Sequence, residues 1–190
     1  MAERVCLVTG AGRGIGRGVA ADLTAAGAPI HRTTDDLWDA TVAINLTVSF
    51  RCIRRAVPAM KQRGYGRIIV IGSVLSKTGA PYTAAYAASK HGVLGLVRAV
   101  AAEFAGTGVT ANAVCPAYVD TAMTDGTVEG IVRATGMTAD QARERLEKMQ
   151  PIGRLITVDE VVRVVRLLAD DDTGSITGQG INVDGGAVMS

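Results

Sequence analysis

Tyr86 and Lys90 are the residues in this sequence whose types and spacing best suit acid–base chemistry. Four residues apart on a helix, they would lie on one face, one turn from each other. Such a pair alone also occurs on helix surfaces without any function. Here Ser73 precedes it, directly after apolar residues 68–72, which predict a buried strand. With a dinucleotide-binding loop nearby, these three side chains would form a reaction centre for hydride transfer.

A glycine-rich stretch near the N-terminus supplies a candidate for that loop. Residues 9–16 read Thr-Gly-Ala-Gly-Arg-Gly-Ile-Gly, between a predicted buried strand at 4–9 and a predicted helix ending near residue 26. Gly10 permits the tight turn, and Gly14 and Gly16 remove side chains where a pyrophosphate and the next helix come close. The helix N-terminus offers free N–H groups to phosphates. A plain strand–helix turn is the alternative, and the flanking strand and helix favour the dinucleotide site.

Composition narrows the class of protein. The chain has 190 residues, 48% hydrophobic and 20% charged, which suits one globular domain. A net charge of +2 gives no reason to expect binding to nucleic acid or to a membrane surface. The cysteines Cys6, Cys52 and Cys115 lack metal-ligand spacing and predict free thiols. No stretch reaches transmembrane length and the N-terminal apolar run is too short for a signal peptide, so we expect a cytoplasmic protein without a metal site.

Strand and helix patterns alternate along the chain, which predicts a single α/β domain over residues 1–190 with a doubly wound parallel sheet of the Rossmann type. A capping box of Thr33 and Asp36 would open the first long helix. After the first strand and helix, the predicted elements are a helix at 35–63, a strand at 67–72, a helix at 86–105, a strand at 109–114, two short helices within 125–150 split by Gly136, a helix from Thr157 to 169 and a strand at 181–183. The charged segment 125–150, whose second helix opens with a capping box of Thr138 and Gln141, is either a solvated face or a mobile lid over a substrate.

The pattern is interrupted after Ile30. A second strand should follow there, ending in a residue that contacts the adenosine ribose, but the long helix begins almost at once. Two strand–helix units, roughly 60 residues at about 30 per unit, are absent between residues 30 and 31. Either the natural chain contains residues that this sequence omits, or the units are truly deleted. A true deletion would leave the edges and faces of the first strand bare, and the omission is the favoured explanation.

With these residues in view, the chain resembles the short-chain dehydrogenase/reductase family over nearly its whole length. The motifs that carry the resemblance stand in the family's order. They are Thr9-Gly10-x-x-x-Gly14-Ile15-Gly16, Ile44-Asn45-Leu46, Ser73, Tyr86-x-x-x-Lys90, Asn112-x-Val114-x-Pro116 and Val183-Asp184-Gly185-Gly186. Residues 89–93 and 115–121 look like those of ketoreductases that act on acyl thioesters and polyketides.

The resemblance implies a role for each matching residue. Tyr86 would be the general acid/base, assisted by the Lys90 cation, and Ser73 would hold the substrate oxygen. Lys90 would also bind the nicotinamide ribose, and Asn45 would anchor a water that links Lys90 to solvent, although a satisfied polar residue at a helix kink is the bland alternative. The further cofactor contacts implied are Thr9, Gly10, Arg13, Gly14, Ile15, Gly16, Pro116, Val119 and Thr121. The further substrate-pocket residues are Leu75, Tyr82, Tyr118 and Met123.

The implied activity is NAD(P)-dependent interconversion of a ketone and a secondary alcohol, with a 3-oxoacyl thioester or polyketide as the finer substrate class. Arg13 could bind a 2′-phosphate, so the prediction slightly favours NADP(H) over NAD(H). A solvated arginine at a helix start is nearly as good an interpretation. Helices 35–63 and 86–105 look like the family's homotetramer interface.

The sequence departs from the family pattern at three points. Ala117 replaces the glycine usual after the loop proline, and both the Asn-Asn-Ala-Gly segment and the second strand lack a counterpart. If residues are omitted, the missing part is the adenosine-side wall, and we expect no ordered dinucleotide. The competing function is a non-catalytic relative that serves nucleotide sensing or assembly.

Overall fold

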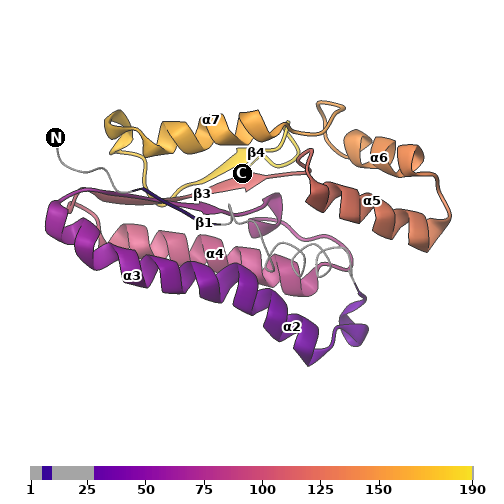
Figure 1. Ribbon diagram of the computed structural model, residues 1–190, viewed down its shortest axis with the longest axis horizontal. Helices are drawn as coiled ribbons and strands as arrows, with labels where there is room; N and C mark the ends of the chain where they lie inside the picture. Colours follow the sequence, from indigo (N-terminus) through magenta and orange to yellow (C-terminus); the bar gives the residue numbers. More distant parts are fainter. Residues whose placement is uncertain (1–5, 10–27, 190) are drawn as a thin grey trace.

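The computed structural model describes residues 6–9 and 28–189. In this part of the chain four strands form one parallel sheet, and they lie side by side in sequence order (Figure 1). The strands are β1 (Cys6–Thr9), β2 (Gly66–Ile71), β3 (Val109–Pro116) and β4 (Gly180–Val183). The glycine-rich residues 10–16 and the helix predicted after them lie outside the described residues.

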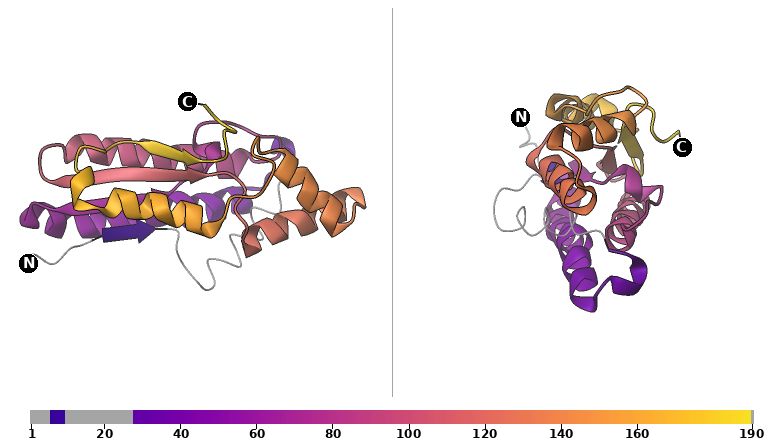
Figure 2. Two further views of the ribbon diagram at one scale, coloured as in Figure 1. Left: turned by 90° about the horizontal axis from the view of Figure 1, so that it is seen from above. Right: turned by 90° about the vertical axis from the view of Figure 1, so that its right-hand side faces the viewer.

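Helices cover both faces of the sheet, which confirms the predicted doubly wound α/β fold. One face carries α3 (Val48–Arg63) and α4 (Ala84–Glu103), and the other carries α7 (Val158–Ala169), as Figure 1 shows. The short helix α2 (Asp35–Val42) continues into α3 through a π-helical turn at 43–47. Helices α5 (Ala122–Thr135) and α6 (Ala139–Lys148) lie beyond the carboxyl ends of the strands (Figures 1 and 2).

Strand β2 is buried on both faces, which explains its continuous apolar run. Ile68 and Val70 face the cluster formed by α3, α4 and the neighbouring strand, whereas Ile69 packs with Val114 and Leu168 on the α7 side. This is the alternation expected of a strand between two helical layers.

Strand β1 pairs directly with β2, from Cys6 opposite Arg67 to Thr9 opposite Val70. No strand among the described residues pairs with its other edge. One edge of β1 therefore has a neighbour, whereas a true deletion was expected to leave both edges bare. Pro29 is followed by a single 3-10 turn, Ile30–Arg32, and then by α2.

Most of the predicted helix starts are confirmed. Thr138 with Gln141 and Thr157 with Glu160 form complete capping boxes at α6 and α7. The predicted box of Thr33 and Asp36 is wrong, because Thr33 closes the 3-10 turn by bonding back to Pro29 and the next threonine caps α2 instead. Gly136 ends α5 at a φ of 73°, a left-handed conformation that glycine adopts without strain.

The amino ends of the strands are fixed by a buried arginine. Arg67 is only 4% exposed and stacks over the Tyr65 ring at 4.5 Å. Its guanidinium donates to four main-chain carbonyls, those of Gly66, Gly108, Asp170 and Asp171, at 3.1–3.2 Å. The last two follow the carboxyl end of α7, where a cation is favoured by the helix dipole. This arginine therefore joins β2, the start of β3 and the end of α7.

Asn112 has a structural place in β3. Its side chain is buried, donates to the Ile176 carbonyl at 2.7 Å and accepts from the Gln179 amide at 3.0 Å. These bonds fix the chain that leads into β4. In the described part of the chain, no helix is long and apolar enough to span a bilayer.

Candidate active site

The candidate site lies at the carboxyl edge of the sheet, where parallel α/β sheets bind ligands. Ser73 follows the end of β2 by two residues, and Tyr86 and Lys90 lie in the first two turns of α4. Pro116 is the last residue of β3. Asn45 approaches from the π-helical turn between α2 and α3. Four separate elements thus supply the residues that the sequence analysis singled out.

Ser73 is held rigidly although it lies in a connecting segment. It caps the 3-10 turn Val74–Ser76, with its Oγ accepting from the Leu75 amide at 3.1 Å. Its own amide donates to the Ser76 hydroxyl at 3.2 Å. Both serines are buried. The side chain oxygen of Ser73 is therefore fixed in place before any ligand binds.

The Lys90 cation is anchored between β2 and the Tyr86 ring. Its Nζ donates to the Ile71 carbonyl at 2.9 Å and lies 5.6 Å from the centroid of the Tyr86 ring. The residue is 9% exposed. An ammonium has three N–H donors, and among the described residues Ile71 is its one hydrogen-bond acceptor. Two donors therefore remain for a ligand's hydroxyl groups.

Asn45 is linked to Tyr86 through a buried serine. Its Nδ2 donates to the Ser89 hydroxyl at 3.1 Å, and that hydroxyl donates to the Tyr86 carbonyl at 2.7 Å. The Asn45 carbonyl accepts from Ser49 at 2.8 Å. A π-turn at this point is notable because such turns often mark functional sites. Whether Asn45 anchors a water beside Lys90 stays a prediction.

Close approach of the two helices makes this link possible. A Cβ on Gly92 of α4 would lie 2.7 Å from a terminal methyl of Leu46 in the π-turn. Glycine at this position lets the turn approach α4 and brings Asn45 to Ser89. Ser89 was quoted in the family motif but given no role from the sequence. Its place three residues after Tyr86 was the available signal, because a serine there can bond to the carbonyl one turn back.

The segment after β3 is fixed by the chain that leads to α7. The Ala117 amide donates to the Val183 carbonyl at 3.2 Å, and Val119 forms a parallel bridge with Ile156. Thr121 bonds back to the Val119 carbonyl through its hydroxyl at 3.3 Å. Of the predicted cofactor contacts, Val119 and Thr121 therefore lie on a well-supported turn, and Pro116 ends the strand that leads into it.

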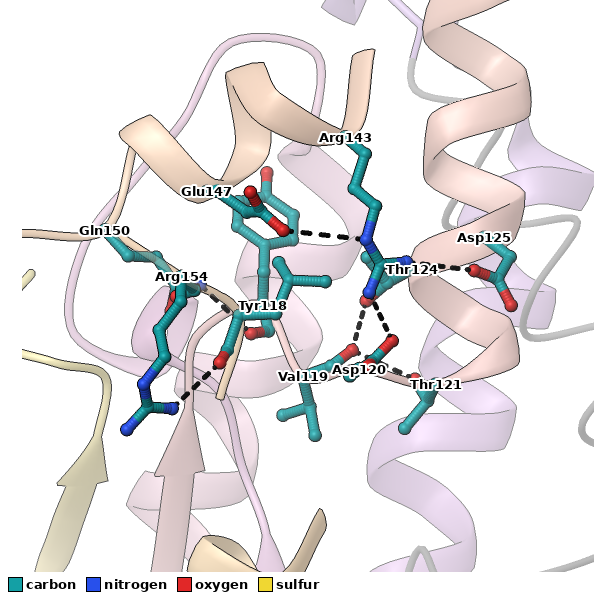
Figure 3. Close-up of polar contacts among 11 residues, drawn as sticks. Tyr118, Val119, Asp120, Thr121, Thr124, Asp125, Arg143, Glu147, Gln150 and Arg154 are labelled. Atoms are coloured by element: carbon teal, nitrogen blue, oxygen red, sulfur yellow. Dashed lines mark hydrogen bonds and ion pairs between the residues drawn. The ribbon is translucent and has the colours of Figure 1, made fainter. Parts of the chain in front are cut away.

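Helices α5 and α6, and Gln150 just after α6, contact this turn at three successive residues (Figure 3). Gln150 donates to the Tyr118 carbonyl at 3.2 Å, and Thr124 donates to the Val119 carbonyl at 2.5 Å. Arg143 of α6 pairs with Asp120 at 2.7 Å. The guanidinium also lies 3.7 Å from Asp125 and 3.6 Å from Glu147. The hydrogen bond to Asp120 raises the pKa of Arg143, so it stays charged. Sequence patterns gave no signal for this arginine beyond its place on a charged helix.

Tyr118 packs against the paired helices α5 and α6. Its ring packs against the cluster of α5, α6 and Leu155 that includes Val128 and Leu146. Burial raises the pKa of its phenol, and the nearby Tyr86 raises it further. The Tyr118 phenol therefore stays neutral at physiological pH.

The other predicted substrate-pocket residues do not all converge. Leu75 is half-buried in the turn after Ser73, and Met123 is exposed in the first turn of α5. Tyr82 is 62% exposed, with a φ of 66° that is rare for an aromatic residue. It lines a cleft of about 480 Å³ formed by residues 28–31 and 79–84 with Ala87. Ser73, Tyr86 and Lys90 do not line that cleft.

The described residues fit the nicotinamide half of a dinucleotide. The two remaining donors of Lys90 suit ribose hydroxyls, and the turn after β3 is fixed by main-chain bonds to Val183 and Ile156. Of the predicted contacts near the N-terminus, Thr9 ends β1, whereas Gly10, Arg13, Gly14, Ile15 and Gly16 lie outside the described residues. Within the described part, no group of three or more potential metal ligands occurs, and Cys52 and Cys115 are free thiols.

Comparisons with known proteins show which family this chain is similar to. A family model described as enoyl-(acyl carrier protein) reductase matches residues 24–188. A D-beta-hydroxybutyrate dehydrogenase of Rhizobium meliloti (strain 1021) is 43% identical over 150 residues, 78% of this chain and 58% of the relative. An acetoacetyl-CoA reductase of Shinella zoogloeoides is 37% identical over 159 residues, 84% of this chain and 62% of the relative.

A solved structure is also similar. The crystal structure of an actinorhodin polyketide ketoreductase variant with NADPH matches with a TM-score of 0.84 and 35% identity, over 96% of this chain and 66% of that one. The chain thus spans about three fifths of the length of the curated relatives named above. The family match covers most of the chain and includes every candidate residue from Asn45 to Thr121. This chain belongs to the short-chain dehydrogenase/reductase family.

Proposed function

We propose that this protein is an NAD(P)-dependent oxidoreductase that interconverts a ketone and a secondary alcohol. The observation that carries the proposal is the Lys90 ammonium, which is fixed by the Ile71 carbonyl beside the Tyr86 ring and keeps two donors for a ligand. A cation in that place favours the charged form of a neighbouring phenol in the reacting complex. The nicotinamide cofactor would supply or accept the hydride.

The residues of this chain would then handle the substrate oxygen and the proton. Ser73 donates a hydrogen bond to the substrate oxygen, and Tyr86 gives a proton to that oxygen in reduction or takes it in oxidation. Lys90 holds the cofactor ribose and stabilises the phenolate of Tyr86. Asn45, through Ser89, keeps the helix that carries Tyr86 in register with the π-turn.

The finer substrate class that we propose is a 3-oxoacyl compound and its 3-hydroxy partner. The similar proteins support it, since their names point to hydroxybutyrate, acetoacetyl-CoA and a polyketide. These substrates share a carbonyl or hydroxyl group with a second oxygenated carbon two atoms away. NADP(H) is the preferred cofactor in this proposal, because Arg13 could meet a 2′-phosphate and the similar ketoreductase was solved with NADPH.

A homotetramer through helices 35–63 and 86–105 remains part of the proposal. Large apolar side chains stay exposed on α2 and α3, namely Trp38, Val48 and Phe50. Helix α4 buries most of its large apolar residues within the protein's own core. The first of the two helices therefore gives the stronger support for an interface. Light scattering that finds a monomer at micromolar concentration would contradict this part of the proposal.

Reduction of acetoacetate and acetoacetyl-CoA, each with NADPH and with NADH, is the test of the activity. We expect the wild type to turn over at least one pair and Tyr86→Phe to lose about a hundredfold or more in kcat, because general acid–base catalysis is worth that much. Cofactor binding, followed by nicotinamide fluorescence, should change by less than about threefold, because Tyr86→Phe removes only one hydroxyl from a ring that stays in place. Tyr65→Phe is the matched control, since it removes a phenol hydroxyl at the opposite edge of the sheet.

The competing function, a non-catalytic relative for nucleotide sensing or assembly, predicts a different outcome. Wild type and Tyr86→Phe would then bind the dinucleotide equally and both remain inert with ketones and with secondary alcohols. The interruption after residue 30 and the methyl group of Ala117 are the features that favour this alternative.

A further inference from the structure

Ser76 is a buried residue at the candidate site to which neither the motifs nor the proposed mechanism assigns a role. It is 2% exposed and ends the 3-10 turn that follows Ser73. Its Oγ accepts the hydrogen bond of the Ser73 amide at 3.2 Å. Ser73 is the residue that would touch the substrate oxygen. The buried Ser76 hydroxyl bonds to Ser73 and can therefore control its orientation.

Two hydrogen bonds fix the amide and the side-chain oxygen of Ser73 and leave its hydroxyl proton to be donated to a substrate. The main chain of Ser73 is extended, with φ −164° and ψ 162°, and the Ser76 hydroxyl holds its amide. The Leu75 amide donates to the Ser73 Oγ at 3.1 Å, which occupies one of the two lone pairs. Among the described residues, no acceptor is recorded for the Ser73 hydroxyl proton. That proton is available for a substrate oxygen.

The thiol of Cys115 lies against the Ser76 side chain and the Ser73 amide, and it is fully buried near the end of β3. A Cβ on Gly72 would lie 3.0 Å from both the Ser76 Oγ and the Cys115 Sγ, so a side chain at position 72 would crowd both groups. Burial raises the pKa of the thiol more than Lys77 and the hydrogen bonds lower it. Cys115 is therefore a neutral, packed support rather than a reactive group.

We infer that Ser76 is a positioning residue, which holds Ser73 in the orientation that directs its hydroxyl toward the substrate oxygen, with Cys115 supporting it from β3. The inference rests on the proposed function, because it gives Ser76 its effect through Ser73. It adds a second layer to the site, which the motif Ser73, Tyr86 and Lys90 does not reveal. Small displacements of a group that contacts the reacting atoms are costly, so the effect should appear in kcat.

The test is a double-mutant cycle on turnover of whichever 3-oxo substrate the wild type accepts. Ser76→Ala should lower kcat about tenfold, with a smaller change in KM, because a misoriented Ser73 acts mainly in the transition state. In a Ser73→Ala background, Ser76→Ala should change kcat less than about twofold, because its effect passes through the missing hydroxyl. Thr110→Val is the matched control, a buried hydroxyl removed from the opposite end of β3, and it should leave kcat unchanged.

A second variant keeps the inference testable if Ser76→Ala does not fold. Cys115→Ala removes the support beneath Ser76 and should lower kcat by about threefold, a loss that Ser73→Ala should again cancel. The inference is overturned if Ser76→Ala lowers kcat equally in the wild type and in Ser73→Ala. It is also overturned if Ser73→Ala lowers kcat while Ser76→Ala keeps full activity. Either result would leave the proposed function standing. An inactive wild type would overturn the proposed function and the inference with it.

Discussion

Two arginines at opposite ends of the parallel sheet are held in opposite ways. At the amino edge, Arg67 is 4% exposed and its guanidinium donates to four main-chain carbonyls. At the carboxyl edge, the side chain of Arg143 is 37% exposed and pairs with the carboxylates of Asp120, Asp125 and Glu147 (Figure 3). Arg67 joins elements that are far apart in the sequence, whereas Arg143 joins α6 to the helix and turn that precede it.

The difference lies in what replaces each contact when it breaks. Carbonyls that lose a buried guanidinium remain largely shielded from water, which costs free energy for each unpaired group. Exposed carboxylates and an exposed arginine are rehydrated at little cost, and salt screens their attraction. We therefore expect a fixed amino edge and an adjustable carboxyl edge, where α5 and α6 join the turn at residues 118–121.

Gly108→Ala should produce the largest loss of stability, because it combines backbone strain with a steric overlap at the amino edge of the sheet. Gly108 has a φ of 81°, and an added Cβ would overlap the carbonyl oxygen of Gly64. Strain and overpacking together predict a fall of about 3 kcal/mol in the free energy of unfolding, measured by urea denaturation. Gly106→Ala is the matched control, since its φ is 77° but no atom lies within 4 Å of the added Cβ. It should lose about 1 kcal/mol from the backbone term alone. Equal losses in both variants would refute the close contact.

Arg67→Met should come next, at about 2 kcal/mol, since it leaves several carbonyls without their donor while keeping an apolar stem in the space. Thermal and urea denaturation would both report the loss. Arg55→Met, an exposed arginine on α3, serves as the control and should change stability by less than about 0.5 kcal/mol. If the two variants prove equally stable, the amino edge is not held as described.

Arg143→Gln should change global stability by less than about 1 kcal/mol, because its partners are exposed. Its effect should instead be local, with amide hydrogen exchange in α5 and α6 several-fold faster than in the wild type. Raising the salt concentration should accelerate exchange there in the wild type but not in the variant. Arg133→Gln removes a weaker pair within α5, with Glu129 at 3.9 Å, and should leave exchange in α6 unchanged. Exchange that is insensitive to both Arg143→Gln and salt would argue against an adjustable edge.

The smallest expected effect concerns acid stability at the start of α7. Hydrogen bonds from Arg154 first, and then from Thr157, lower the pKa of Glu160 from 4.5 to about 2. A lowered pKa stabilises the folded state above pH 4.5, and this contribution is lost as the pH falls toward 2. Between these values the melting temperature of the wild type should fall more steeply than that of Glu160→Gln. Parallel curves over that interval would show that the ion pair does not contribute.

The elements were predictable because their signals are local. Buried strands such as β2 show as continuous apolar runs, and the capping boxes of Thr138 and Thr157 fix helix starts within a few residues. Thr33 failed as a cap because the adjacent threonine competes for the same role, and local sequence does not decide between neighbours. The family motif predicted which residues would gather at the carboxyl edge of the sheet, and the roles of those residues stay predictions.

The supporting contacts were not predictable, because each joins residues from separate elements. The bond from Asn45 to Ser89 depends on a π-turn and on the close approach at Gly92. Ser76 and Arg143 have ordinary residue types in ordinary places, and only the packing of β3 and α6 gives them partners. The direct pairing of β1 with β2 was also unforeseen, since the sequence predicted that intervening strands were absent but not how the sheet would close.

The central claim is that this protein transfers a hydride between a nicotinamide and a carbonyl carbon, with Tyr86 handling the proton. The most direct measurement is mass spectrometry of the alcohol formed from acetoacetate or acetoacetyl-CoA with NADPH or NADH deuterated at C4, using both C4 epimers. The account predicts one deuterium on the carbinol carbon from one epimer only, and a much slower appearance of it with Tyr86→Phe. Product without deuterium from either epimer, or equal rates for the wild type and Tyr86→Phe, would contradict it.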